Sequence, residues 1–343
     1  MRKRIALWAL IIAAAVVVPL RIQDNRYWLT LGIVGCIYAV FTCGQTLLLG
    51  YAGQVSLGHA ALYGIGAYTS AILTSRHDWP FPLAFAMAGV LTAVVAYFLG
   101  RPMLHLEPFY LAMATLVLGI AANEIFHTWT SVTGGTGGVI GIPSASLGPI
   151  ELDEPLRYLY FTLAVALIVL ALSGTLVRTF VGRAFRAIKS DEAGALAAGV
   201  DVRAFKAKVF ALSGALAGLA GAMYAHHAQF ISPESFGTDL SVLVVIMAVV
   251  GGPTRIVGAA IGAIFLVGFP EITRSYGEWR DLMYGAVLFV TLVFAPEGIA
   301  GTASAIGRRL RPYAGRRPKP PTAASASTAD HKAISRRLET VDP

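Results

Sequence analysis

Charged residues are scarce in this sequence. They make up 13% of its 343 residues, whereas hydrophobic residues make up 56%. Soluble domains carry about 25% charged residues, so the composition excludes an ordinary soluble fold of this size. Asp, Glu, Lys and Arg are missing from the whole stretch between Arg26 and Arg76, and also from residues 81–100 and 158–177. Because about 20 apolar residues cross a bilayer as a helix, we predict an all-α, polytopic membrane protein.

Motifs for nucleotide hydrolysis, metal binding and nucleophilic catalysis are missing too. The sequence contains no GxxxxGK[ST] loop and no HxxE or CxxC pattern, and the positions of its Ser, His and Asp residues do not suggest a catalytic triad. Its two cysteines, Cys36 and Cys43, fall in one apolar segment and are interpreted as small buried hydrophobic residues. The net charge of +8 comes mostly from a basic tail without the basic–aromatic interleaving of nucleic-acid binders. We therefore expect no enzyme activity, cofactor, metal site or nucleic-acid partner for this chain.

Apolar runs predict about eight to ten membrane spans within a transmembrane domain of residues 1–300. The predicted spans are 5–20, 27–49, 57–74, 81–100, 108–128, 157–178, 206–227, 240–254, 256–270 and 282–297. The first run resembles a signal peptide, but Pro19 and Arg21 stand where a cleavage site is expected, which favours an uncleaved span. The runs 240–254 and 256–270 meet close to Gly251-Gly252-Pro253. They are either two short tilted helices or one re-entrant hairpin, and such a break hints at a pathway.

Lys and Arg are unevenly distributed between the loops, and this predicts the orientation. The basic N-terminus and the basic segment 178–208 are expected in the cytoplasm. The loop 128–156 has no Lys or Arg but several acidic residues, so we expect it outside. An even number of spans returns the C-terminus to the cytoplasm. Residues 301–343 form a basic tail that we predict to be disordered, and it contacts anionic lipid or has a specific binding role.

A polar, Gly-rich stretch, Gly53–Tyr68, interrupts the longest uncharged region. Gln, Ser and His cost free energy in lipid, and glycines permit both close helix packing and a helix break. The stretch is therefore either a tight packing face or a broken helix beside a translocation pathway. The pathway candidates are Gly53, Gln54, Ser56, Gly58, His59, Gly64, Gly66 and Tyr68, together with Glu124, which is alternatively an interfacial anchor at the end of a later span.

The predicted cytoplasmic segment 180–205 contains the amphipathic, helix-favouring run Gly182–Asp201. Glu192 and Ala193 open a short Ala-rich helix, and Gly199 ends it. A short helix held between spans suits docking into a groove on another protein. The alternative is a charged loop that only satisfies the topology.

Small residues at GxxxG spacing occur in two of the later apolar runs. Gly214 and Gly218 form one pair, and Gly258 and Gly262 form the other. This spacing predicts faces where helix backbones approach closely.

Several motifs occur in an order that is typical of one transporter family. They are Gly53–Tyr68, Gly182–Asp201 and Leu216–Ala225, and together they resemble the permeases of branched-chain amino acid ABC transporters, the LivH/LivM type. Phe230–Phe236, the Gly-rich loop after Glu124 and the closing Phe294–Gly298 are similar to the LivM branch in particular. The resemblance covers about residues 27–300. Gly251–Ala259 departs from the family's usual Gly-Gly-x-Gly-[Thr/Ser]-x-x-Gly-Pro pattern, because one Gly and the later Pro are missing and Arg255 is added.

The resemblance implies a permease subunit of an ABC importer in a bacterial inner membrane. A second homologous permease would share the pathway, two cytoplasmic ATP-binding subunits would drive it, and a periplasmic substrate-binding protein would deliver the substrate. It implies coupling to the ATPase through Arg183, Ala184, Lys189, Glu192, Ala193 and Gly199. It makes Thr133, Gly134, Gly135, Gly137 and Gly138 candidate contacts for the binding protein.

The resemblance makes branched-chain amino acids the expected substrate. A same-fold importer of urea, short amides or aromatic acids is the alternative. A stand-alone, ion-coupled secondary carrier is less favoured, because charged residues are lacking at mid-membrane.

Overall fold

The computed structural model describes residues 25–103, 106–273 and 298–302, together with Trp279, Leu282, Gly285, Ala286, Phe289 and Val293. The chain divides into two compact units, Met1–Thr302 and Ala303–Pro343, and all described residues belong to the first. The predicted span 5–20 and the predicted tail beyond residue 302 lie outside the described residues. The predicted span 282–297 is described only at isolated positions. Of the closing motif Phe294–Gly298, residues 294–297 lie outside the described residues.

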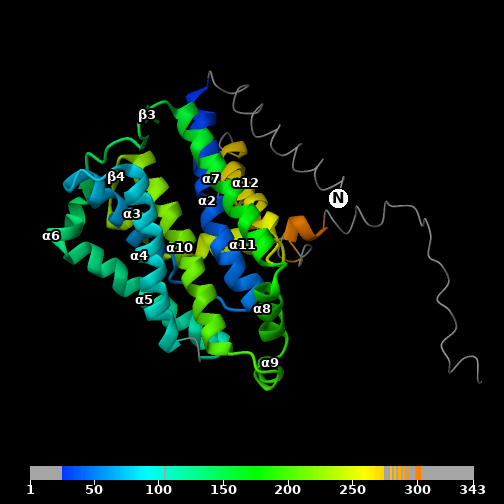
Figure 1. Ribbon diagram of the computed structural model, residues 1–343. Helices are drawn as coiled ribbons and strands as arrows, with labels where there is room; N and C mark the ends of the chain where they lie inside the picture. Colours follow the sequence, from blue (N-terminus) through cyan, green and yellow to red (C-terminus); the bar gives the residue numbers. More distant parts are fainter. Residues whose placement is uncertain are drawn as a thin grey trace, which may run out of the picture. The chain divides into compact units, whose positions relative to one another are not determined.

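The described chain is almost entirely helical, as Figure 1 shows. The helices are α2 (Arg26–Thr46), α3 (His59–Arg76), α4 (Phe81–Met103), α5 (Pro108–Thr128), α6 (Thr130–Thr133), α7 (Pro155–Leu176), α8 (Phe180–Ser190), α9 (Glu192–Ala197), α10 (Val202–Ala228), α11 (Thr238–Gly251) and α12 (Ile256–Ile272). Four two-residue strands form two antiparallel pairs, β1 (Val139–Ile140) with β4 (Phe230–Ile231) and β2 (Ser146–Leu147) with β3 (Ile150–Glu151).

Six helical segments are long and apolar enough to cross a membrane in the described part of the chain. They are Arg26–Tyr51, Phe81–Met103, Pro108–Thr128, Pro155–Leu176, Val202–Ala228 and Pro233–Gly251. A further apolar helix, Ile256–Glu271, is shorter. The predicted polytopic α-helical membrane protein is therefore confirmed. The runs 240–254 and 256–270 form two separate helices, α11 and α12, which pack on one another and are joined by residues 252–255.

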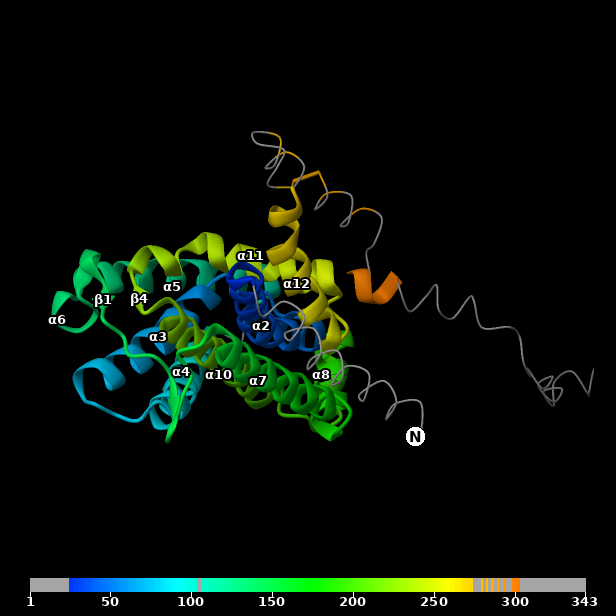
Figure 2. The same cartoon turned by 90° about the horizontal axis from the view of Figure 1, so that it is seen from above.

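Helices α10 and α2 form the centre of the described unit. The most extensive contacts of α10 are with α3 and α4, and α2 packs against α7, α10 and α12. Figure 2 shows α2 between α7 and the α11–α12 pair. A Cβ on Gly66 of α3 would lie 2.3 Å from the Cα of Gly218 in α10, so these backbones approach as closely as glycine permits. Both GxxxG pairs lie at such contacts, which confirms them as packing faces.

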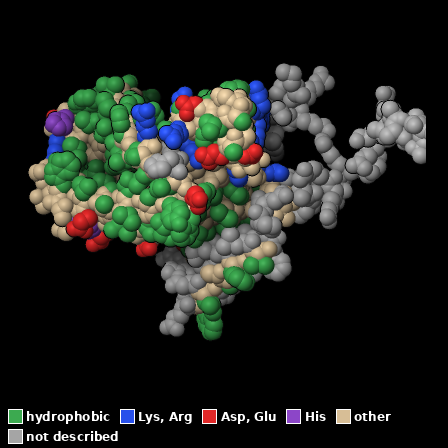
Figure 3. All heavy atoms as spheres, turned by 90° about the horizontal axis from the view of Figure 1, so that it is seen from below, with side chains coloured by type: hydrophobic (Ala, Val, Ile, Leu, Met, Phe, Trp, Pro, Cys, Tyr) green, Lys and Arg blue, Asp and Glu red, His purple; other side chains and the backbone are tan. Residues whose placement is uncertain are grey.

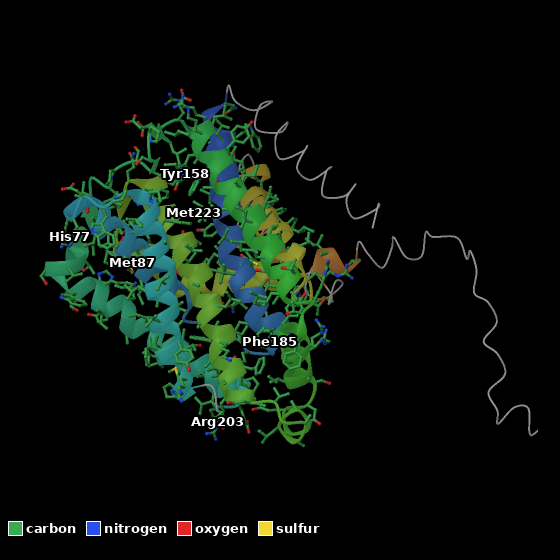
Figure 4. All side chains as sticks on the ribbon, in the orientation of Figure 1. His77, Met87, Tyr158, Phe185, Arg203 and Met223 are labelled. Carbon is green, nitrogen blue, oxygen red and sulfur yellow. The ribbon has the colours of Figure 1, made fainter. Side chains whose placement is uncertain are left out.

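The helices run between two ends of different character. Figure 1 shows α8 and α9 at one end, here called the α9 end, and α6 with the strands at the other, here called the strand end. Figure 4 marks Phe185 and Arg203 towards the α9 end and the Tyr158–Met223 pair towards the strand end. The Tyr158 hydroxyl donates a hydrogen bond to the Met223 carbonyl at 2.6 Å and fixes α7 to α10 there. Figure 3 shows basic side chains gathered, with acidic ones among them, on the face seen from below Figure 1, beside broad hydrophobic surface.

Candidate functional site

The chain breaks between α2 and α3 in the middle of the uncharged region. Helix α2 ends in the π-helical turn Leu47–Tyr51, and residues 53–58 are non-helical before α3 begins at His59. Gly53 has φ +70°, a conformation that favours glycine. The backbone N–H of Gln54 donates a hydrogen bond to the Leu48 carbonyl at 3.1 Å. We call residues 53–58 the break.

The break is shorter than the polar, Gly-rich stretch Gly53–Tyr68 that the sequence predicts as an interruption or a packing face. Gly64 and Gly66 lie inside α3, where the helix continues without interruption. Their small size serves packing, because a Cβ on Gly64 would lie 2.7 Å from the Phe126 ring and Gly66 meets Gly218. Composition alone does not distinguish a packing glycine from a helix-breaking one, and this stretch contains both.

Four neighbouring helices each supply one neutral polar side chain to the break or to the first turn of α3. The Gln45 Nε2 of α2 donates to the Ser56 carbonyl at 3.1 Å, and the Leu57 amide donates to Thr115 Oγ1 of α5 at 3.0 Å. The Ala60 amide donates to Ser241 Oγ of α11 at 2.9 Å. His59 Nε2 lies 2.6 Å from Ser213 Oγ of α10. The four partners missed by the sequence analysis are Gln45, Thr115, Ser213 and Ser241.

Buried polar atoms without a hydrogen-bond partner concentrate around the break. Among the described residues, they include both amide atoms of Gln54, the Ser56 hydroxyl, His59 Nδ1, Gln45 Oε1 and the Thr46 hydroxyl. An unpaired buried polar group costs about 1–3 kcal/mol, and such groups persist where function requires them. A cavity of about 10 Å³, which holds roughly one water molecule, adjoins Ser56, Gly58 and Thr115.

The residues of the break are uncharged. Among the described Asp, Glu, Lys and Arg residues, only Lys206 is buried. It lies on the segment 178–208, which is predicted to be cytoplasmic, and not at the break. Residues 53–58, His59 and their side-chain partners therefore offer amides, hydroxyls, an imidazole and helix ends to a ligand and carry no fixed charge of their own. The Lys189 cation lies at the edge of the break, on the Gly50 carbonyl.

The structure brings together only part of the predicted pathway set. Gln54, Ser56, Gly58 and His59 are buried at the break or the first turn of α3. Tyr68 lies further along α3 against the rings of Phe126 and Phe236. Glu124 is exposed and lies about two and a half turns beyond Thr115 on α5, so it is separated from the break.

The predicted coupling segment forms two helices at the α9 end. Helix α8 buries Ala184, Phe185 and Ile188 and exposes Arg183 and Lys189. Ala184 is buried and packs within this chain, and its part in coupling to another subunit stays a prediction.

The second of these helices has the start that the sequence predicts. Helix α9 begins at Glu192, and both Glu192 and Ala193 are exposed. Gly199 follows the helix with φ +80°. The Glu192 carboxylate pairs with Lys206 Nζ at 2.7 Å, which fixes the start of α9 to α10.

The Gly-rich loop is folded rather than flexible. Thr133 and Gly135 are buried, and the Thr133 hydroxyl donates to the Phe126 carbonyl at 2.7 Å. A Cβ on Gly138 would lie 2.1 Å from the Ile231 carbonyl oxygen, and Gly134 is partly buried. Among the five predicted contact residues only Gly137 is fully exposed. Thr133 and Gly135 are buried and Gly134 and Gly138 are partly buried, so they shape the loop, and contact of this loop with a binding protein stays a prediction.

A known protein family matches most of this chain. The family model described as "Branched-chain amino acid transport system / permease component" matches residues 27–295, which include the break, α8, α9 and the Gly-rich loop. This chain belongs to that permease family. The permease is 31% identical to the "High-affinity branched-chain amino acid transport system permease protein LivM" of Escherichia coli (strain K12), over 77% of this chain and 67% of the relative. The LivM protein of Salmonella typhimurium (strain LT2) is 30% identical over the same shares.

A second kind of relative covers more of the permease. The "Autoinducer 2 import system permease protein LsrC" of Salmonella paratyphi B is 28% identical over 93% of this chain and 99% of the relative. No solved structure matches the permease significantly. The predicted LivM-type resemblance is confirmed, and the permease is a multi-pass membrane protein related to transport subunits.

Proposed function

We propose that the permease forms half of the translocation pathway of an ATP-driven importer of branched-chain amino acids. A second homologous permease supplies the other half, two ATP-binding subunits drive the cycle, and a substrate-binding protein delivers the ligand. The family match over residues 27–295 carries this proposal, because it spans every element around the break. ATP hydrolysis takes place in the partner subunits, since the sequence has no phosphate-binding loop of its own.

The neutral chemistry of the break suits a zwitterionic substrate. Its carboxylate and ammonium groups are best met by helix ends, amides and hydroxyls, because a single fixed charge would favour one group and repel the other. The apolar walls around Phe41 and Phe210, which lie close to His59, suit an aliphatic side chain. Because the cavity beside Ser56 is far smaller than any amino acid, passage requires the helices to move, as in alternating access.

The orientation belongs to the same proposal. Basic residues gather on α8, at the start of α10 and at adjoining helix ends, among them Arg101, Arg178, Arg183, Arg186, Lys189, Arg203, Lys206 and Lys208. Glu151 lies on β3, and Asp153 and Glu154 lie between β3 and α7, at the strand end. The positive-inside rule then places the α9 end in the cytoplasm and the strand end in the periplasm of a bacterial inner membrane. The exposed start of α9 faces the ATP-binding subunits in this orientation.

A second candidate function is the import of another small polar molecule by the same fold. The LsrC relatives carry the printed name of an autoinducer 2 import permease, and importers of urea, short amides or aromatic acids remain alternatives. A stand-alone secondary carrier is less favoured, because the described break contains no charged residue to bind a coupling ion.

Transport by the complex reconstituted in proteoliposomes tests the proposal. The complex contains the permease, its genomically neighbouring permease and ATPases, and the neighbouring binding protein. We expect ATP-dependent uptake of radiolabelled leucine that unlabelled isoleucine and valine suppress and urea does not. Uptake without ATP, or suppression by urea or an aromatic acid alone, would contradict the amino acid importer.

Coupling to the ATPase is tested separately at α9. Glu192→Gln and Gly199→Val are expected to lower both ATPase co-purification and uptake. Normal assembly and uptake in both variants would exclude α9 as the docking helix.

A further inference from the structure

A lysine from the coupling segment reaches the end of the broken helix. Lys189 lies in the last turn of α8, and its Nζ donates a hydrogen bond to the Gly50 carbonyl at 2.8 Å. Gly50 belongs to the π-helical turn that ends α2, directly before the break. Carbonyls in the last turn of a helix lack an amide partner within the helix and attract cations. The contact therefore joins a cation to a helix end that favours it.

The backbone around this contact leaves no room for larger side chains. A Cβ on Gly53 would lie 3.0 Å from Lys189 Cγ, and a Cβ on Gly50 would lie 1.6 Å from the Pro253 carbonyl oxygen. The Tyr51 hydroxyl donates to the Thr254 carbonyl at 2.8 Å. Three segments that are far apart in the sequence, α8, the π-helical turn and the α11–α12 loop, thus meet at one point. We call these contacts the junction.

The junction is the short connection between the coupling segment and the break. Asp191 alone separates α8 from α9, so a displacement of α9 pulls directly on Lys189. The backbone N–H of Gln54 in the break is hydrogen-bonded to the carbonyl of Leu48 in the π-helical turn. We therefore expect the π-helical turn and the break to move together. Helix α10 also contacts α8 and α9, but its 27 residues pack chiefly against α3 and α4.

We propose that Lys189 is a positioning residue that transmits movement of α8 and α9 to the break and thereby opens or closes the pathway. This inference rests on the proposed function and adds to it the residue through which ATP-driven movement reaches the pathway. Lys189 makes its contact within one chain, whereas Ala193 is exposed at the start of α9. Loss of the Lys189 contact therefore uncouples the break from the ATPases without removing the surface on which they dock.

Three variants in the reconstituted complex test this role. In Lys189→Met the ATPases should co-purify at wild-type amounts and hydrolyse ATP, while uptake per ATP hydrolysed falls about tenfold, the loss expected for one charge-assisted hydrogen bond. Lys189→Arg keeps a cation within reach and should recover most of the uptake. Lys208→Met is the control, because Lys208 is an exposed lysine on α10 outside the junction, and it should behave as the wild type. Wild-type uptake per ATP in Lys189→Met, or a fall that only matches lost assembly, would overturn the proposal.

Hydrogen exchange of the permease separates this inference from the proposed function. Amides of residues 53–58 should exchange about tenfold faster in Lys189→Met than in the wild type, while those of residues 139–142 are unchanged. Unchanged exchange at the break would overturn the link. Failure of the wild-type complex to take up leucine would instead contradict the proposed function, and the exchange result would still decide whether Lys189 controls the break.

Discussion

The two ends of the helices are held together in different ways. At the strand end, buried groups make hydrogen bonds between segments that are far apart in sequence. His226 Nδ1 lies 2.8 Å from the Pro143 carbonyl, so this nitrogen carries the hydrogen, and Nε2 accepts a hydrogen bond from Ser70 at 2.9 Å. Strand β1 pairs with β4. At the α9 end the links named above are two lysine contacts, Lys189 with Gly50 and Lys206 with Glu192, and the hydrogen bond from the Tyr51 hydroxyl to the Thr254 carbonyl.

This difference indicates which end moves. Buried hydrogen bonds are costly to break because the groups stay desolvated. Contacts with a solvent-exposed partner, such as Lys189 or the 58% exposed Glu192 side chain, are weaker and tolerate displacement. We therefore expect the strand end to act as the pivot and the α9 end to move when force is applied to α9. The following predictions test this comparison.

The largest effect is expected for Gly50→Ala at the junction. The new Cβ would lie 1.6 Å from the Pro253 carbonyl oxygen, so the α11–α12 loop or the π-helical turn must shift. Such overpacking costs about 1–3 kcal/mol, and uptake should fall about tenfold or more. Gly35→Ala on the same helix is the control, because no heavy atom lies within 4 Å of its Cβ position and uptake should stay normal. Equal uptake by the two variants would show that the junction has no tight geometry.

At the strand end, Thr133→Val should lower stability rather than transport. It removes the hydroxyl that donates to the Phe126 carbonyl and accepts from the Gly135 amide, at a cost of about 1–3 kcal/mol. Thermal unfolding in detergent should shift down, while uptake per folded molecule stays at the wild-type value. Thr136→Val is the control, because Thr136 is exposed. A loss of uptake per folded molecule in Thr133→Val would contradict a static role for this end.

Much of the fold followed from the sequence because it depends on residue types along the chain. The uncharged runs predicted spans 81–100 and 108–128, and α4 and α5 are Phe81–Met103 and Pro108–Thr128. The start of α9 at Glu192 followed from local helix signals. These features depend on neighbours in sequence, which periodicity and capping report directly.

The site was less predictable because its contacts join distant segments. Ser213 lies 154 residues from His59, and Gly50 lies 139 residues from Lys189. No spacing rule pairs such positions. One signal was available, because Gln45 is a polar residue inside an apolar span, and such residues are candidates for a functional site.

A smaller effect is expected for Lys206→Met at the α9 end. The variant releases the start of α9 from α10 by removing the partner of Glu192, whose side chain is 58% exposed. Because the Glu192 side of the pair is open to solvent and methionine fills the buried Lys206 position, stability should change by about 1 kcal/mol or less. Co-purification of the ATPases should nevertheless fall by a few-fold, since α9 is no longer oriented, and Lys208→Met should leave it unchanged. Full co-purification by Lys206→Met would show that α9 keeps its orientation without this ion pair.

The smallest effect is expected at the exposed apolar pair of the strand end. Ile140 and Phe230 are opposite one another in the β1–β4 pair and are 76% and 45% exposed, so they offer an apolar contact beside the exposed Gly137. If the binding protein docks there, Ile140→Ser should raise the concentration of binding protein needed for half-maximal uptake about fivefold, the equivalent of about 1 kcal/mol. Ile150→Ser, on the separate β2–β3 pair, is the control and should have no effect. Both variants should unfold at the wild-type temperature, because these side chains are exposed. A change in the maximal rate of uptake, rather than in the required concentration, would mean that the strand end takes part in the movement and does not serve as its pivot.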